Sequence, residues 1–388
     1  MEKIAIVTVA YNRIDSLKRL LSSLEKAFYD RDVDLIISID KSNTDKVELF
    51  ADNYIWNYGK KIVDKHDVNF GLRKHMLSLG KWFDSYDALV VLEDDVVVAP
   101  SFYTYASQCV AKYKDNSNIA GISLYTFEVN YLNQTPFQPL KSAYDVYFMN
   151  CAMSWGEVWL KKQWNEFYAW YAEHQDYPQL QHIPERVCNM GPKSWLKYHT
   201  RYCIEQNKYF VYPYHSLSTN FSDVGTHNSN QTSVFQVALQ QGLKKNWYMP
   251  TEIDEAICYD GFFENKAVSQ IFPQYRNDVC VDINGLKRDY SINRYLLSTT
   301  GLNYQIVASY GLLLRPIENN VIENIPGSSI YLYDTKIRAV NTKTLTSTET
   351  YTYYQYRINS ITTFLRRYGY RNLFRRLLSS ITSRVKKQ

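Results

Sequence analysis

The sequence predicts an α/β fold in which a mixed, mainly parallel sheet is flanked by helices, followed by a smaller C-terminal subdomain and a terminal amphipathic helix. Three observations lead to this prediction. Apolar runs alternate with amphipathic stretches through the first third of the chain, polar residues follow the runs where they end, and the pattern changes after Asp254. Such alternation is typical of parallel strands that are joined by helices.

The expected elements follow that alternation along the chain. Strands are predicted over residues 4–10, 33–39, 61–65, 88–92 and 119–124, with helices over 14–29, 46–58, 72–83 and 101–114. The Trp- and Tyr-rich stretch 144–214 is predicted to be helical, with an amphipathic helix over 157–171, and shorter strands are predicted over 279–283, 304–314 and 329–333. We therefore expect a sheet domain over 1–250, made of the halves 1–125 and 126–250, then a subdomain over 251–350 and a tail over 351–388.

The charge of the chain is uneven. The formal net charge is +5, and residues 357–388 contain nine Lys and Arg and no Asp or Glu. The net charge of the preceding residues is therefore 5 − 9 = −4. A body that binds nucleic acid would spread basic residues over one of its faces. We therefore expect no nucleic-acid partner.

The tail is predicted to form a basic amphipathic helix. Apolar residues recur at helical spacing from Ile358 to Val385, and Arg367, Arg371 and Arg375 are four residues apart. This pattern is typical of a helix that lies on an anionic membrane surface. The alternative is a helix that packs its apolar stripe against the protein and leaves its arginines in water.

The cysteines and the N-terminus favour a cytoplasmic protein. The six cysteines are widely spaced without a CxxC pair, so free thiols in a reducing compartment are expected. The first apolar run breaks at Tyr11-Asn12-Arg13, too early for a signal peptide, and no stretch of about 18 apolar residues is present. Together with the tail, this predicts a cytoplasmic protein at the inner face of the plasma membrane.

The strongest local signal is the acidic run that follows the predicted strand 88–92. Glu93, Asp94 and Asp95 are adjacent, and like charges this close raise one another's pKa. A divalent cation would neutralise them, and oxygen ligands suit Mg²⁺ or Mn²⁺. The alternative is an acidic turn whose carboxylates are exposed or cap the helix that begins near Ser101.

The segment 90–106, VVLEDDVVVAPSFYTYA, resembles the metal-binding segment of GT-A glycosyltransferases. It is most similar to the EDD-type segment of N-acetylglucosaminyltransferase I and of the related bacterial family 2 enzymes, and weaker similarity extends to residues 7–13, 71–75 and 79–83. The resemblance implies a GT-A fold, which is a Rossmann-like nucleotide-binding sheet, with a donor half over 1–125 and an acceptor half over 126–250. It also implies a nucleotide-sugar donor, for which a UDP-sugar is the hypothesis, and a Mn²⁺ or Mg²⁺ cofactor.

The resemblance also implies roles for single residues. Asp95 would ligate the metal, Glu93 and Asp94 would contact the sugar and the ribose, and Asp40 would meet the uracil. Arg13, Arg73 and Lys74 would lie near the diphosphate or the base, although each could be an ordinary surface charge. Thr8 and Tyr11, in the first similar block, are further donor-binding candidates. The ending from Ser218 to His227 resembles that of bacterial relatives, so His227 is a second candidate ligand of the metal.

One segment departs from the pattern. Inverting relatives carry a catalytic Asp where this chain has Pro192-Lys193-Ser194-Trp195-Leu196, without a carboxylate. An inverting transfer needs a base for the proton of the acceptor hydroxyl. Glu157, beside the Trp155-Gly156 loop, is the first candidate, followed by Glu185 and Asp223. A retaining mechanism would need no such base.

The prediction is therefore a metal-dependent, inverting glycosyltransferase with a UDP-sugar donor. Its acceptor is expected to be a glycan or lipid-linked oligosaccharide of a bacterial surface polysaccharide such as capsule or O-antigen. One alternative is a nucleotidyltransferase, which should carry a Gly-rich loop after the first strand, where this chain reads Ala10-Tyr11-Asn12-Arg13. Another is a glycan-binding protein on the same fold that has lost its base.

Overall fold

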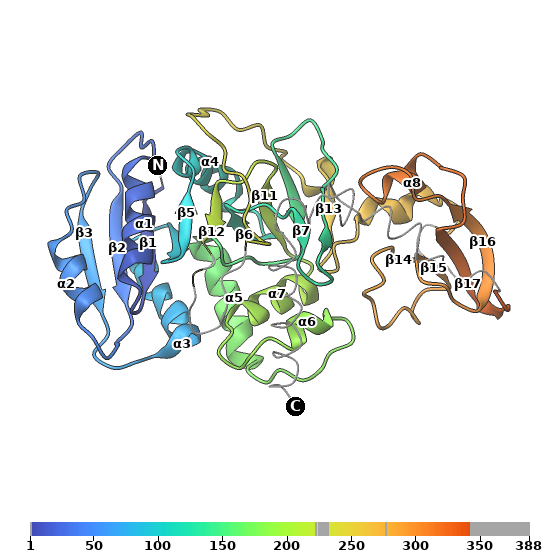
Figure 1. The fold of residues 1–388 in the computed structure, drawn as a ribbon, viewed down its shortest axis with the longest axis horizontal. Helices are drawn as coiled ribbons and strands as arrows, with labels where there is room; N and C mark the ends of the chain where they lie inside the picture. Colours follow the sequence, from blue (N-terminus) through green and yellow to red (C-terminus); the bar gives the residue numbers. More distant parts are fainter. Residues whose placement is uncertain (1, 222, 224–232, 276–277, 342–388) are drawn as a thin grey trace, which may run out of the picture.

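The computed structural model describes residues 2–221, 223, 233–275 and 278–341 (Figure 1). A nine-stranded sheet forms the large domain, with the order β13-β9-β11-β6-β10-β4-β1-β2-β3. The strand β1 pairs in parallel with β2 and β4, and β2 pairs in parallel with β3. The strand β10 runs antiparallel between β4 and β6. The strands of this sheet are β1 (Ile4–Ala10), β2 (Asp34–Ile39), β3 (Lys61–Lys65), β4 (Ala88–Glu93), β6 (Ile119–Ser123), β9 (Val146–Met149), β10 (Glu157–Leu160), β11 (Tyr209–Pro213) and β13 (Cys258–Tyr259).

Two separate hydrophobic cores cover the two faces of this sheet. Alternate residues of each strand point to opposite faces, so Val90 belongs to one core and Val91 to the other. One face packs against α1 (Ile14–Glu25), α2 (Lys46–Asn53) and α4 (Phe102–Tyr113). The other face packs against α3 (Gly71–Ser78), the 3₁₀ helix Leu79–Asp84, α5 (Lys161–Glu173), α6 (Glu185–Cys188) and α7 (Leu196–Glu205). The mixed, mainly parallel sheet with flanking helices confirms the predicted fold class.

Two predicted helices are shorter in the structure because aromatic side chains hold the chain elsewhere. The helix expected over 14–29 ends at Glu25, since Tyr29 packs among aromatic rings that include Trp56 at 5.7 Å between centroids. The helix expected over 46–58 ends at Asn53, and the Trp56 indole N–H donates to the Val33 carbonyl at 2.7 Å. Both ends are set by contacts between distant segments.

The prediction of one helix over 157–171 is wrong at its start. Residues 157–160 form β10, which pairs with both β4 and β6, and α5 begins only at Lys161. Gly156 has a φ of +101°, which interrupts any helix there. The open edges of β4 and β6 offer backbone partners on both sides of this short segment, and these outweigh its local helical pattern.

Two small sheets and a C-terminal unit complete the described chain. The strand β5 (Val96–Val98) pairs with β12 (Ser218–Asn220), and β7 (Val129–Asn130) pairs with β8 (Thr135–Pro136). The C-terminal unit has a core of its own around the sheet β14-β15-β17-β16 and lies at one side of the large sheet (Figure 1). Its elements are the 3₁₀ helix Lys266–Ile271, β14 (Val279–Asp282), β15 (Tyr295–Ser298), β16 (Tyr304–Tyr310), α8 (Asn319–Ile322) and β17 (Ile330–Arg338), preceded by the 3₁₀ helix Ile253–Glu255.

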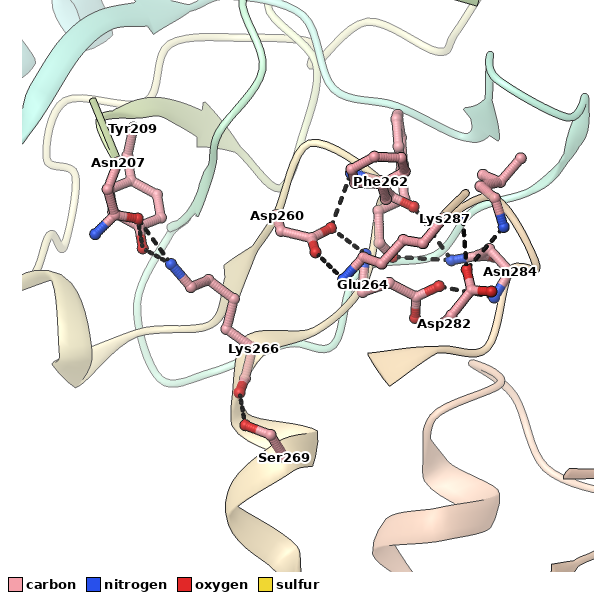
Figure 2. Close-up of polar contacts among 12 residues, drawn as sticks. Asn207, Tyr209, Asp260, Phe262, Glu264, Lys266, Ser269, Asp282, Asn284 and Lys287 are labelled. Atoms are coloured by element: carbon pink, nitrogen blue, oxygen red, sulfur yellow. Dashed lines mark hydrogen bonds and ion pairs between the residues drawn. The ribbon is translucent and has the colours of Figure 1, made fainter. Parts of the chain in front are cut away.

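The boundary between the two cores lies later than the expected residue 250. The strand β13 still pairs with β9 of the large sheet, and Phe263 packs in the core of that sheet, whereas Val268 belongs to the C-terminal core. A partly buried polar group marks this junction (Figure 2). There Lys287 pairs with Asp260 at 2.7 Å, and the Asn284 N–H donates to Glu264 Oε1 at 2.7 Å.

The predicted tail over 351–388 lies outside the described residues. Within the described ranges, no helix has the length and apolar character that a membrane span requires. The six cysteines are all unpaired, in agreement with the expected free thiols.

Gly121 of β6 should be the position where the large sheet is least tolerant of an added methyl group. A Cβ there would lie 2.5 Å from the Phe210 ring, whereas a Cβ at Gly191 would meet no atom within 4 Å. We expect Gly121→Ala to lower the free energy of unfolding by about 1–3 kcal/mol through overpacking. Urea titration of both variants checks this; equal stability of Gly121→Ala and the control Gly191→Ala would contradict the described packing.

Candidate active site

Three consecutive acidic residues lie at the carboxyl edge of the parallel strands. Glu93 is the last residue of β4, and Asp94 and Asp95 form the turn that leads into β5. The register pairs Glu93 with Val9 of β1, and the Asp94 N–H donates to the Val9 carbonyl at 3.0 Å. The acidic turn is therefore fixed beside the end of β1, the edge at which open α/β sheets bind ligands.

Arg13 bridges two of these three carboxylates. It follows β1 and directly precedes α1, so its side chain reaches across the edge of the sheet. Its guanidinium forms an ion pair with Asp94, and its Nη1 donates to Asp95 Oδ2 at 3.1 Å. The Asp94 side chain is 4% exposed and that of Asp95 is 20% exposed, so Asp95 is the more accessible carboxylate of the pair.

Burial keeps protons on this cluster. It raises the pKa of Glu93 to about 8, with the neighbouring Asp95 and Asp94 adding to the effect, while a hydrogen bond from Ser154 and the charge of Arg13 oppose it. Burial also raises the pKa of Asp94 to about 7, although Arg13 acts in the opposite direction. Near neutral pH the cluster therefore carries less negative charge than its three carboxyl groups would in water.

Asp40 holds the loop that begins α3. It follows β2 directly, is buried, and its Oδ1 accepts from the Phe70 N–H at 2.7 Å while its Oδ2 accepts from the Gly71 N–H at 2.8 Å. Oδ1 also accepts from the Lys41 N–H at 3.0 Å. These backbone donors occupy much of the hydrogen-bonding capacity of the Asp40 carboxylate. The predicted contact with uracil would therefore use oxygens that already accept these hydrogen bonds.

The other predicted donor-binding residues separate into two groups. Thr8 is fully buried on β1, where it pairs with Leu92 of β4, and Tyr11, the residue after that strand, is 36% exposed. Arg73 and Lys74 lie on α3 instead. Arg73 Nη1 donates to the Tyr198 hydroxyl of α7 at 2.9 Å, and the Lys74 ammonium lies 4.1 Å from the centre of the Phe70 ring. The structure therefore brings Arg13, and not Arg73, onto the acidic turn.

Glu157, the predicted base, lies on β10 with its side chain buried. Its Oε2 accepts from the Trp159 indole N–H at 2.5 Å, and its Oε1 has no hydrogen-bond partner among the described residues. Burial raises the pKa of Glu157 well above its ordinary value, and the charge of Glu93 adds to this. A protonated carboxyl cannot accept a proton, so Glu157 could serve as a base only after losing its own.

The remaining candidates lie around the end of β12. The Phe221 N–H donates to the Asp95 carbonyl at 2.7 Å, which places the end of β12 beside the acidic turn. Asp223 accepts from Ser16 Oγ at 2.6 Å and forms an ion pair with Arg19, both on α1. His227, the second predicted metal ligand, lies outside the described residues. Glu185 is exposed at the start of α6.

The acidic turn fits a hard divalent cation only in part. Its oxygen donors are of the right kind, and Mg²⁺ in particular is held by one or two carboxylates together with phosphate oxygens. Among the described residues, however, no group of three or more His, Cys, Asp or Glu side chains has a metal-binding arrangement. Asp95 would hold the ion, and the substrate phosphates would supply further ligands.

The protonated state of Glu157 can be tested through stability. For an acid whose pKa is raised by folding, the stability it contributes is complete below the unfolded-state value of 4.5 and is lost as the pH rises toward the folded-state value. Glutamine cannot ionise, so the stability of Glu157→Gln relative to the wild type should increase between about pH 5 and pH 8, by at most about 1.4 kcal/mol per pH unit. Urea unfolding at several pH values measures this.

The exposed Glu185→Gln is the matched control for the removal of a carboxyl group. A pH-independent difference between Glu157→Gln and the wild type would contradict a protonated Glu157 in the folded protein.

The site lies within a segment of the chain that matches a known protein family. Residues 5–167 match the family model described as glycosyl transferase family 2, a segment that runs from β1 into α5 and includes Arg13, the acidic turn and Glu157. A comparison with curated proteins gave no match.

Three solved structures illustrate what the fold is similar to. The first is the mannosyltransferase PcManGT from Pyrobaculum calidifontis with GDP-Man and Mn²⁺, at 10% identity and a TM-score of 0.35, with 55% of this chain and 55% of that chain covered. The second is residues 1–349 of S. aureus TarS with UDP, at 12% identity and a TM-score of 0.36, with 56% and 59% covered. The third is GalNAc-T7 with UDP, GalNAc and Mn²⁺, at 13% identity and a TM-score of 0.36, with 55% and 43% covered. The chain spans less than two thirds of each of these structures, and such low TM-scores support no conclusion about substrate. The family match covers residues 5–167, which is less than half of the 388 residues.

Proposed function

We propose that the protein is a glycosyltransferase that moves a sugar from a nucleotide-diphosphate sugar, with uridine as the expected nucleotide, to a glycan acceptor. The observation that carries the proposal is the acidic turn Glu93-Asp94-Asp95 held by Arg13 at the carboxyl edge of a parallel sheet. The family match over residues 5–167 supports a glycosyltransferase. The finer relation to N-acetylglucosaminyltransferase I rests on the motifs of the sequence.

The residues at this edge of the sheet would each bind a different part of the donor or its cation. Asp95, the more exposed carboxylate of the pair, would hold the divalent cation. Glu93 and Asp94 would accept hydrogen bonds from the sugar and ribose hydroxyls, and a protonated Glu93 could also donate one. When bound, Mn²⁺ or Mg²⁺ would offset the charge that develops on the leaving diphosphate. Arg13 would supply a second positive charge to the same diphosphate.

The transfer itself requires a place for one proton. The bond between the anomeric carbon and the diphosphate oxygen breaks, the acceptor oxygen forms the new bond to that carbon, and the acceptor hydroxyl loses its proton. In an inverting reaction a base takes this proton. Glu157 is the proposed base, since residues 192–196 contain no carboxylate. Because its pKa is raised, Glu157 must lose its own proton before it can act as this base. A nearby cation would favour the ionised carboxylate.

One observation favours a second candidate function. The segment 192–196 lacks an acid and Glu157 is buried, which is what a glycan-binding protein derived from a glycosyltransferase would show. Such a protein would bind the glycan without consuming the donor. The retained acidic turn favours the enzyme, because glycan binding alone does not require it.

The acceptor and the cellular location are part of the proposal. The basic, acid-free stretch 357–388 would bring the protein to the anionic inner face of the plasma membrane. There a lipid-linked oligosaccharide for bacterial capsule or O-antigen synthesis would be available as the acceptor.

Donor hydrolysis tests the proposal without knowledge of the acceptor. We expect the full chain to release UDP slowly from at least one UDP-sugar in the presence of Mn²⁺, and Asp95→Asn to reduce kcat/KM by about 100-fold or more, since a bound metal supplies several kcal/mol of stabilisation. Asp115→Asn, whose side chain is 85% exposed, is the control. Full activity in Asp95→Asn would contradict the assigned site.

The proposed base has its own test. Once an acceptor is found, Glu157→Gln should reduce kcat of transfer by about 100-fold or more if Glu157 takes the proton. UDP binding by the variant should be unchanged. Wild-type transfer by Glu157→Gln would exclude Glu157 and favour a retaining route or another acid.

A further inference from the structure

Two cationic side chains of the face opposite α1 and α2 share one tyrosine ring. Arg73 comes from α3 and Lys197 from the first turn of α7. The Arg73 Cζ lies 5.5 Å and the Lys197 Nζ lies 5.3 Å from the centre of the Tyr198 ring. Among the described residues, neither cation forms an ion pair with Asp or Glu.

The hydrogen-bonding capacity of both groups is largely unused. Arg73 has five N–H donors and Lys197 has three. Within the described chain, Arg73 donates only to the Tyr198 hydroxyl at 2.9 Å, and Lys197 Nζ donates only to the Met190 carbonyl at 3.4 Å. Lys197 is 6% exposed, so water does little to satisfy its ammonium.

The neighbouring acid is committed elsewhere. Glu205, on the same helix as Lys197, accepts from Arg201 Nε at 2.8 Å and pairs with His182 at 2.9 Å. Burial lowers the pKa of Lys197, and the positive charge of Arg73 lowers it further. A buried, unpaired ammonium is costly to the fold unless something else compensates for it. The fold therefore keeps the half-buried Arg73 and the buried Lys197 near one another, with tyrosine rings and not carboxylates as their neighbours among the described residues.

Arg73 connects this pair to the proposed transfer site. It lies two residues after Gly71, whose N–H is held by Asp40 at the carboxyl edge of β2. Lys197 and Tyr198 follow directly on the segment 192–196, which lies in the expected acceptor half and is where inverting relatives carry their catalytic Asp. The half-buried Tyr177, whose ring centre lies 4.7 Å from Lys197 Nζ, adds an aromatic face to the same place.

We propose that Arg73 and Lys197, arranged around Tyr198, bind a phosphate group of the acceptor. Two fixed cations with free N–H donors match the charge and the oxygen acceptors of a phosphate ester, and tyrosine faces suit the sugar or lipid attached to it. The assignment of the phosphate to an acceptor rests on the proposed function. It also moves Arg73 from the donor, where the resemblance placed it, to the acceptor.

The test uses the full chain with the donor site filled. Binding of geranyl phosphate and of inorganic phosphate is measured by calorimetry in saturating UDP and Mn²⁺, for the wild type, Lys197→Met, Arg73→Met and the exposed control Lys193→Met. We expect Lys197→Met and Arg73→Met each to weaken geranyl phosphate binding by about tenfold or more, as for the loss of a charge-assisted hydrogen bond. Lys193→Met should bind as the wild type does.

Stability separates this role from a structural one. Methionine keeps the apolar stem of Lys197 and removes its unpaired charge, so the midpoint of urea unfolding should be unchanged or higher in Lys197→Met. A lower midpoint together with wild-type phosphate binding would overturn the proposal and make Lys197 a structural residue. Loss of phosphate binding with retained or increased stability supports it.

The two probes and the donor distinguish the remaining outcomes. Tighter binding of geranyl phosphate than of inorganic phosphate supports a lipid-linked acceptor, and equal binding assigns the site to a water-soluble phosphate ester. Failure of the wild type to bind either probe while UDP binds overturns the anion site and leaves the proposed function intact. Failure to bind UDP contradicts the proposed function, whereas phosphate binding that depends on Lys197 would still support the anion site.

Discussion

The partial burial of three adjacent carboxyl groups at the end of β4, of which Asp94 is the most deeply buried, is the constraint on which the rest of the site depends. Moving a carboxylate out of water costs several kcal/mol even after the protein relaxes. The chain meets this cost in two ways, through the bridge from Arg13 to Asp94 and Asp95 and through the raised pKa values of Glu93 and Asp94. A fold under selection for stability alone would place apolar residues there, so the cluster is best explained by a ligand that uses it.

Charge is distributed unevenly in a way that fits a two-substrate site. The acidic turn at the ends of β1 and β4 has more carboxyl groups than cations, whereas Arg73 of α3 and Lys197 of α7 have no carboxylate partner in the described part of the chain. The first suits a cation with a nucleotide diphosphate, and the second suits an anion. The partly buried group around Asp260, Glu264 and Lys287 differs from both, because it joins the large sheet to the C-terminal unit and its members bond to one another and to the backbone (Figure 2).

The sequence predicted the parts of the structure that local pattern determines. The strands β1 to β4 and the acidic turn follow from apolar runs and the residues that end them. The early ends of α1 and α2 could not be predicted, because Tyr29 and Trp56 are held by segments far away in the chain. The local pattern predicts a helix at Glu157 because the strand there has only four residues and adjoins a helical pattern. The residues that pair with Glu157 in β4 and β6 are 66 and 34 positions away in the sequence, so the strand has no local signal. The contact of Arg73 with Tyr198 spans 125 residues and has no local signature.

The most direct test of the central claim is calorimetry of UDP binding with and without Mn²⁺, on the wild type and on Asp95→Ala. The account predicts UDP binding by the wild type that depends on Mn²⁺ and disappears in Asp95→Ala, because Asp95 presents the accessible carboxylate of the acidic turn. Absence of UDP binding by the wild type in either condition would contradict a uridine-nucleotide site at this edge of the sheet. Binding that is equal in the wild type and Asp95→Ala would contradict the role of the acidic turn.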